Sequence, residues 1–304
     1  MEPTEEQPPA DAATPEPGAG RMRLRRAALQ ERGTRLAERA DAERRRHASV
    51  DAVFEMVDRD ADVGGGIIAG ALAYRLFIWL LPLALVLVAG LGVAADAAAE
   101  SPEEAAGSVG MEGLISHSVA SAASSANRWY AILIGVPILI WVTRSFLRAL
   151  IGTHRRVWAD LRTAAPRPTV LRTLTLLLLL LGFWVVSGLA SALRAWSPGP
   201  GIIATVLALV PYAALWLLVS SQLPHRGAHW TALLPGALLF AVCLEVLNVA
   251  VAYVITPYAL AKEGTYGALG LAAALLFGLY LVSRVVVASA VVNATLWERA
   301  GRTS

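Results

Sequence analysis

Residues 66–94 form one long apolar stretch with a single charge, Arg75, in its interior. A helix rises about 1.5 Å per residue, so roughly 20 apolar residues cross a bilayer core of about 30 Å, and this stretch is long enough to do so. An amphipathic helix of a soluble protein shows a polar residue at every third or fourth position, and this stretch does not. The chain is therefore expected to fold within a membrane.

Five further apolar stretches follow the first one. Together they predict an all-α, polytopic membrane protein with six transmembrane helices. The predicted spans are 66–94, 129–151, 169–193, 201–223, 230–255 and 265–296. Composition agrees, because apolar residues make up 56% of the chain and charged residues only 16%, whereas a soluble domain carries about 25% charged residues.

Arginine placement predicts the orientation of these spans. The loop 152–168 and the N-terminal region are rich in arginine, and the short loop near Pro224 carries His225, Arg226 and His229. The 95–128 segment carries mostly acidic charges. We therefore expect both chain ends in the cytoplasm (N-in, C-in) and the 95–128 segment outside. Ser101-Pro102 resembles a helix start, which predicts a short helical extracytoplasmic segment between the first and second spans.

The rest of the chain divides by composition. Residues 1–20 are acidic and rich in proline, and we predict that they are disordered. Residues 21–62 form an Arg-rich amphipathic helical region in the cytoplasm, which either lies on the membrane surface or is a solvated helix whose arginines only set topology. The six-helix transmembrane domain then covers residues 63–297, and residues 298–304 form a cytoplasmic tail.

Four ionisable residues fall well inside the predicted spans, namely Arg75, Arg144, Glu245 and Arg284. Each costs several kcal/mol in lipid unless it is paired or hydrated. Glu245 and Arg284 are expected near mid-membrane, where they can pair, but one carboxylate does not neutralise three guanidinium groups. The excess charge favours a path for an anion or an anionic lipid, because the planar arginine fork suits phosphate. In the alternative, structural interpretation, the arginines cap backbone carbonyls, pair with Glu245 or extend to the interface.

Uncharged features of the spans are explained by helix packing or by motion. Pro82, Pro137, Pro211 and Pro235 lie inside spans or at their start, where each removes a backbone donor and can kink its helix. Such kinks either open a cavity or hinge, or are packing geometry alone. Polar residues such as Asn248 and Asn293 are expected to form interhelical hydrogen bonds.

The sequence carries none of the common enzyme motifs. A phosphate loop, HExxH, GxSxG and paired CxxC are all absent. His154, His225 and His229 stand in loops apart from paired carboxylates, so we predict neither a metal site nor a cofactor. A ribonuclease would need a water-accessible group of carboxylates or histidines that faces RNA. The cytoplasmic segments offer arginines but no such group, so we expect no enzymatic activity and no nucleic-acid partner.

Several short motifs stand in the order and spacing of a known family. They are Ala71-Leu72-Ala73-Tyr74 followed by Pro82-Leu83, then Leu234-Pro235-Gly236-Ala237, and then Tyr266-Gly267-Ala268-Leu269-Gly270. With them, roughly residues 50–297 resemble the YihY/BrkB family of bacterial inner-membrane proteins, which was historically mis-assigned as a ribonuclease. The resemblance implies a six-span bundle in the bacterial inner membrane and a link to envelope lipid traffic. One departure is Ser289-Ala290-Val291, where relatives often carry a glycine-alanine-glutamate group.

These features favour a protein that handles or transports an anionic lipid or envelope precursor, with Arg75, Arg144, Glu245 and Arg284 along its path. The alternative is a membrane scaffold without transport activity, and a third hypothesis is an ion or solute channel. The expected partners are the anionic headgroups of membrane lipids and, in the scaffold hypothesis, a protein bound to the N-terminal Arg-rich helix.

Overall fold

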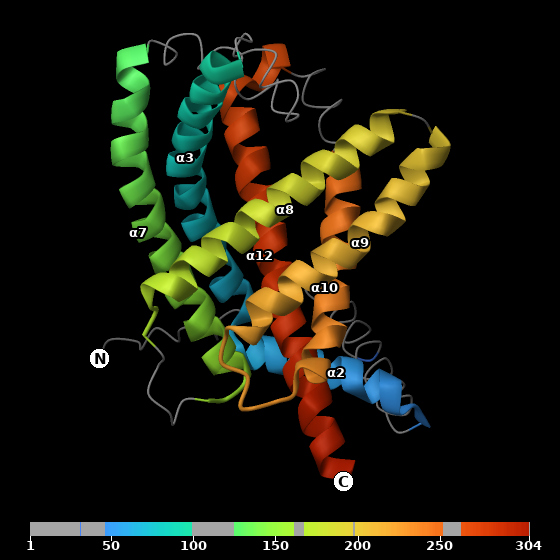
Figure 1. The fold of residues 1–304 in the computed structure, drawn as a ribbon. Coiled ribbons are helices and arrows are strands. Elements are labelled where there is room, and N and C mark those ends of the chain that lie inside the picture. The colour runs from blue at the N-terminus through green and yellow to red at the C-terminus, as the bar shows by residue number, and fades with distance from the viewer. Residues whose placement is uncertain are drawn as a thin grey trace, which may run out of the picture. The chain divides into compact units, whose positions relative to one another are not determined.

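The structure of the chain, a computed structural model, describes residue 31 and residues 46–98, 125–160, 167–196, 198–251 and 263–303. Over these ranges it is helical and contains no strand (Figure 1). The helices are α2 (Ala48–Val63), α3 (Gly65–Ala98), α7 (Ser125–Val157), α8 (Val170–Trp196), α9 (Pro198–Ser221), the short 3-10 helix η1 (Trp230–Leu233), α10 (Leu234–Ala250) and α12 (Glu263–Thr303). The all-α class predicted from the sequence is confirmed for this part of the chain.

Within the ranges that the structure describes, five helical segments are long and apolar enough to cross a membrane. They are Gly65–Gly90, Trp129–Val157, Val170–Arg194, Trp230–Ala250 and Ala272–Arg302, and the apolar part of α9, Thr205–Ser221, is shorter. The polytopic helical architecture therefore agrees with the sequence, while the count of six spans and the N-in/C-in orientation remain predictions. The predictions for residues 1–20, for most of 21–62 and for the segment between 98 and 125 concern residues outside the described ranges.

The chain separates into two compact units, Met1–Phe54 and Glu55–Ser304, and the helical bundle belongs to the second. Within this bundle α3 packs against α7 and α12, while α9 packs against both α8 and α10. α10 also packs against α12, so α12 joins the α3–α7 pair to the α8–α9–α10 group. We call the end of the bundle formed by the last turn of α7, residues 222–233 and the last turns of α12 its basal end.

Close contact between α10 and α12 depends on one glycine near the start of α10. The backbone N–H of Gly236 donates a 2.7 Å hydrogen bond to Oδ1 of Asn293. A Cβ at this position would clash with the carbonyl oxygen of Ser289 and with the Asn293 amide. Ser289 Oγ in turn accepts a 2.9 Å hydrogen bond from the indole of Trp216 in α9. The expected interhelical hydrogen bond of Asn293 is confirmed, and together with the Trp216–Ser289 bond it links α9 and α10 to α12.

The four prolines fall at two kinds of position. Pro82, Pro137 and Pro211 lie inside α3, α7 and α9, which continue through them. Pro235 lies in the first turn of α10, where a backbone N–H would have no helical partner in any case. A role of the three interior prolines in a hinge or cavity remains a prediction.

The last helix extends further than expected. α12 continues beyond the predicted span 265–296 to Thr303, while the assignment of residues 298–304 to a cytoplasmic tail remains a prediction. Three charged side chains of these last turns, Glu298, Arg299 and Arg302, bind residues of α2. These ion pairs explain why the helix does not end where the apolar sequence ends.

Candidate functional site

The four ionisable residues singled out in the sequence lie in three separate places. Arg75 and Arg144 are exposed on the outside of α3 and α7. Glu245 is buried between α8, α9 and α10. Arg284 faces α2. The structure therefore does not bring them together in one channel through the bundle.

Three arginines, Arg75, Arg144 and Arg148, form what we call the arginine patch. Arg75 lies ten residues into α3, about 15 Å along the helix from its start, and donates hydrogen bonds to the hydroxyl and, at 3.4 Å, to the carbonyl oxygen of Ser145. That contact sets the register between α3 and α7, so Arg75 lies level with Arg144. Arg148 follows Arg144 by one helical turn on the same face of α7. All three arginines are exposed.

The surroundings of the arginine patch are apolar and aromatic. Tyr74 on α3 and Trp141 on α7 are exposed beside it, and Ile134 and Ile138 continue the exposed face of α7. Within the described part of the chain, none of the three guanidinium groups forms an ion pair with a carboxylate. The patch is thus a group of uncompensated positive charges on a face suited to lipid.

Glu245 has a different partner from the one expected. Its Oε1 accepts a 2.5 Å hydrogen bond from Nη2 of Arg194, and the two side chains are only 4% and 7% exposed. Nε of Arg194 also donates to Thr205 Oγ1 at 3.2 Å. The predicted Glu245–Arg284 pair is therefore wrong. The Glu245 carboxylate binds Arg194, at the end of α8, instead. The second oxygen of Glu245 is buried without a hydrogen-bond partner among the described residues.

Two further polar side chains link α9 and α10 beside this ion pair. Asn248, one turn after Glu245, donates a 2.9 Å hydrogen bond to the hydroxyl of the fully buried Tyr212. The expected interhelical role of Asn248 is confirmed. Together these contacts form a compact polar cluster inside an otherwise apolar helix group.

Arg284 binds Asp60 through two parallel hydrogen bonds. Its Nη1 and Nη2 each lie 3.0 Å from one carboxylate oxygen. Gly65, the first residue of α3, allows this approach, because a Cβ there would clash with the Asp60 carboxylate and with Arg284. Arg284 therefore lies beside the start of α3 rather than near the middle of the bundle, where counting from the predicted span ends placed it.

A second set of ion pairs fastens α2 to the last turns of α12. Arg59 donates to both oxygens of Glu298 at 2.8 and 2.7 Å, and its Nε donates to the carbonyl oxygen of Val157. Arg299 and Arg302 each donate a 2.7 Å hydrogen bond to Glu55. Burial raises the pKa of Glu55, but the hydrogen bonds and charges of the two arginines outweigh it and hold that pKa below its ordinary value of 4.5.

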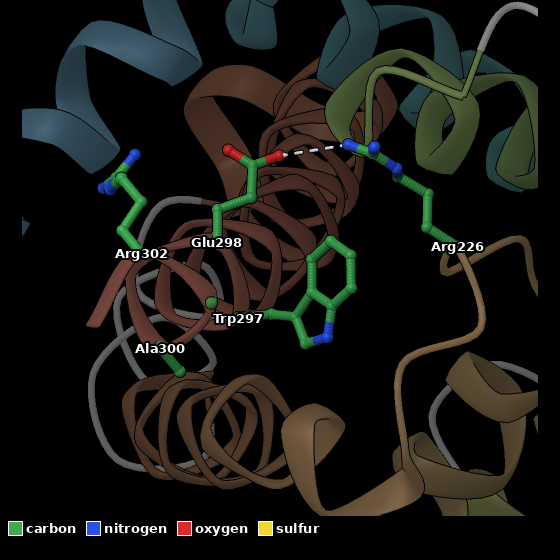
Figure 2. A pocket seen from close by; sticks show the side chains of 6 residues that line it. Arg226, Trp297, Glu298, Ala300 and Arg302 are labelled. Carbon is green, nitrogen blue, oxygen red and sulfur yellow. Dashed lines mark ion pairs between the residues drawn. The ribbon is translucent and has the colours of Figure 1, made fainter. Parts of the chain in front are cut away.

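A pocket of about 610 Å³ opens at the basal end of the bundle. It is lined by Arg226, Trp297, Glu298, Ala300, Gly301 and Arg302 (Figure 2). Arg226 comes from the turn after α9, and the other residues come from the last turns of α12. Neither the arginine patch nor Arg284 contributes to this pocket.

Sequence reasoning missed several of the residues that complete these sites. Arg194 lies one residue beyond the predicted span 169–193, directly after an apolar run, and this position is the signal that could have marked it. No local sequence pattern marks Asp60 or Arg226, because each forms its ion pair with a residue far along the chain. The described residues contain no group of three or more His, Cys, Asp or Glu side chains that could hold a metal ion.

Comparisons with known proteins agree with the resemblance noted in the sequence. The chain is 34% identical over 153 residues to a UPF0761 membrane protein of Rhodospirillum centenum, a match that covers 46% of this chain and 34% of that relative's length. No solved structure matches the chain. A family model described as "Virulence factor BrkB" matches residues 61–304, which is most of the chain and all of the helical bundle from the end of α2 onward. The chain therefore belongs to the BrkB family of membrane proteins.

Proposed function

We propose that this membrane protein binds and handles anionic lipids at the arginine patch. The observation that carries the proposal is the placement of Arg75, Arg144 and Arg148 on an exposed apolar face without a carboxylate partner among the described residues. An arginine at the centre of a membrane span costs about 2.5–3.5 kcal/mol on insertion scales. A lipid phosphate that enters the patch supplies the missing negative charge.

The chemistry of the patch suits a phosphate better than a carboxylate or a neutral headgroup. Each guanidinium presents a planar fork of donors that matches two oxygens of a phosphate. The hydroxyl and carbonyl of Ser145 hold Arg75 in place, so less side-chain freedom is lost when a lipid binds. Exposed Tyr74 and Trp141 add aromatic surface beside these arginines.

This proposal changes the route expected from the sequence. Glu245 and Arg284 already hold partners of opposite charge, Arg194 and Asp60, so they have no charge left for a lipid phosphate. The arginine patch retains its charge and faces outward. We therefore place lipid contact on the outer face of α3 and α7 rather than inside the bundle.

The test measures which lipids stay bound to the purified protein. The Arg75→Gln/Arg144→Gln/Arg148→Gln variant and wild type are placed in nanodiscs that contain phosphatidylglycerol and phosphatidylcholine. The lipids that remain on the protein are then counted by native mass spectrometry. We expect the variant to lose most of its preference for phosphatidylglycerol. The matched control is Arg172→Gln, since Arg172 is exposed at the start of α8 outside the patch. Equal preference in wild type and the triple variant would overturn the proposal.

A second assay separates transport from binding alone. Proteoliposomes with a fluorescent phosphatidylglycerol report whether the wild-type protein moves lipid between leaflets. Movement that is lost in the triple variant supports a transporter. Binding without movement favours the scaffold hypothesis, in which deletion of residues 1–47 removes the cellular function and leaves lipid retention unchanged.

A further inference from the structure

We propose that the basal pocket is a separate, water-facing binding site for a phosphate group, with Arg226 as its principal ligand. The site is independent of the arginine patch, because it contains none of the same residues. Its volume of about 610 Å³ falls in the range of about 300–1,000 Å³ that is usual for small-molecule sites. On the predicted orientation it opens toward the cytoplasm.

Arg226 is held in position by an unusual backbone. It has a φ of +50°, and the next residue, Gly227, has a φ of +71°. For a residue other than glycine, such a left-handed conformation is strained, and such residues cluster at functional sites. The turn directs the guanidinium over the ring of Trp297, 5.5 Å from its centre. Trp297 itself packs against Trp158, with 5.6 Å between the ring centres.

The hydrogen-bond donors of Arg226 remain unused among the described residues. The nearest carboxylate oxygen, Oε1 of Glu298, lies 3.6 Å from Nη1, which is too far for a hydrogen bond. Glu298 does not come closer because both of its oxygens already accept from Arg59. Arg226 is also 44% exposed, so a ligand in the pocket can reach it from water.

A second cation stands on the other side of Glu298. Figure 2 shows Arg302 and Arg226 on opposite sides of this carboxylate. Arg302 is 56% exposed and uses only its Nη2 to bind Glu55. Its other nitrogens have no partner among the described residues. The pocket is thus flanked by two arginines with donors to spare.

The lining of the pocket favours an anion. It holds two arginines, Arg226 and Arg302, and one carboxylate, Glu298, whose two oxygens already accept hydrogen bonds from Arg59. The spare donors of the two lining arginines are therefore not taken up by this carboxylate. A phosphate group carries up to two negative charges and offers several oxygens to guanidinium forks. We assign the site to phosphate chemistry, whether the phosphate belongs to a free ion or to a lipid headgroup that bends toward the basal end.

The first experiment uses the full-length protein in phosphatidylcholine nanodiscs and inorganic pyrophosphate as the probe. Isothermal titration calorimetry measures the dissociation constant of wild type and of Arg226→Gln. We expect the substitution to weaken binding about tenfold or more, since it removes a charge-assisted fork. Arg226→Lys, which keeps the charge but loses the fork, should fall between the two. Arg172→Gln should stay within about twofold of wild type.

The outcomes separate this site from the arginine patch. The Arg75→Gln/Arg144→Gln/Arg148→Gln variant should bind pyrophosphate as wild type does, so loss of patch function leaves this proposal intact. No pyrophosphate binding in wild type, or equal loss in Arg226→Gln and Arg172→Gln, would overturn it. The thermal midpoint of each variant, measured in parallel, shows whether a lost signal reflects unfolding. Phosphatidate nanodiscs distinguish the source, because a bound headgroup should reduce pyrophosphate affinity in wild type but not in Arg226→Gln.

Discussion

The arginine patch and the Arg194–Glu245 pair solve the same problem in opposite ways. Both place guanidinium groups in long apolar helices. Arg194 is buried and neutralised by a carboxylate at 2.5 Å, whereas the patch arginines are exposed and keep their charge. A buried guanidinium that lost its partner would be costly, but an exposed one can take a partner from its surroundings. The charged pair of α8 and α10 is thus satisfied within the protein, whereas the arginines of α3 and α7 are the ones that our proposal assigns to a ligand.

The largest effect is expected from Glu245→Ala. The substitution leaves Arg194 buried without its carboxylate, and breaking a buried pair in this way costs about 3–5 kcal/mol. We expect a large drop of the thermal midpoint of unfolding in detergent. Unfolding is monitored by the intrinsic fluorescence of the protein. The double variant Arg194→Met/Glu245→Met should recover most of that loss. If Glu245→Ala were as stable as wild type, the claim that the Arg194–Glu245 pair stabilises the fold would be wrong.

Gly236→Ala tests whether a buried contact without charge contributes as much to the free energy of unfolding as the buried ion pair. The added methyl group meets the backbone of Ser289 and the side chain of Asn293, and overpacking of this kind costs about 1–3 kcal/mol. The same thermal assay should therefore give a smaller shift than Glu245→Ala. A larger shift would mean that helix spacing, more than charge, sets the stability of α8–α12.

Acid tests the partly exposed ion pairs at the basal end. The arginines hold the pKa of Glu55 below 4.5, so the stability that this group contributes is present above pH 4.5 and is lost as the pH falls through the lowered value. The contribution of a partly exposed pair is about 0.2–1 kcal/mol. Wild type should thus lose slightly more stability on acidification than Glu55→Gln does. If the free energy of unfolding fell equally with pH in wild type and Glu55→Gln, the stabilising role of the Glu55 ion pairs would be contradicted.

The smallest effect on stability is expected from Arg144→Gln. Arg144 is exposed and makes no ion pair with any described residue, so its replacement should change the free energy of unfolding by no more than about 0.5 kcal/mol. Retention of phosphatidylglycerol should nevertheless fall in the nanodisc assay. If Arg144→Gln lost as much stability as Glu245→Ala, the patch arginines would be structural in the same way as the buried pair, and the contrast between the two regions would be wrong.

The sequence predicts the helices well because apolar length is a local property. The bounds of α3, α7 and α8 differ from the predicted spans by a few residues at most positions, and the largest difference is at α12, whose charged end is held by α2. The ionic partners were not predictable in the same way. Arg284 lies 224 residues from Asp60, and no spacing rule in the chain connects them. Arg194 was one residue beyond a predicted span, so its burial depended on how α8 and α10 cross.

The ion pairs of α2 have a consequence for the order of biosynthesis. Glu55 and Asp60 meet arginines that follow them by 224 to 247 residues. During translation these carboxylates leave the ribosome before the first span and stay without their partners until α12 is nearly complete. Closure of the contact between α2 and α12 therefore follows the synthesis of all the helices that lie between them.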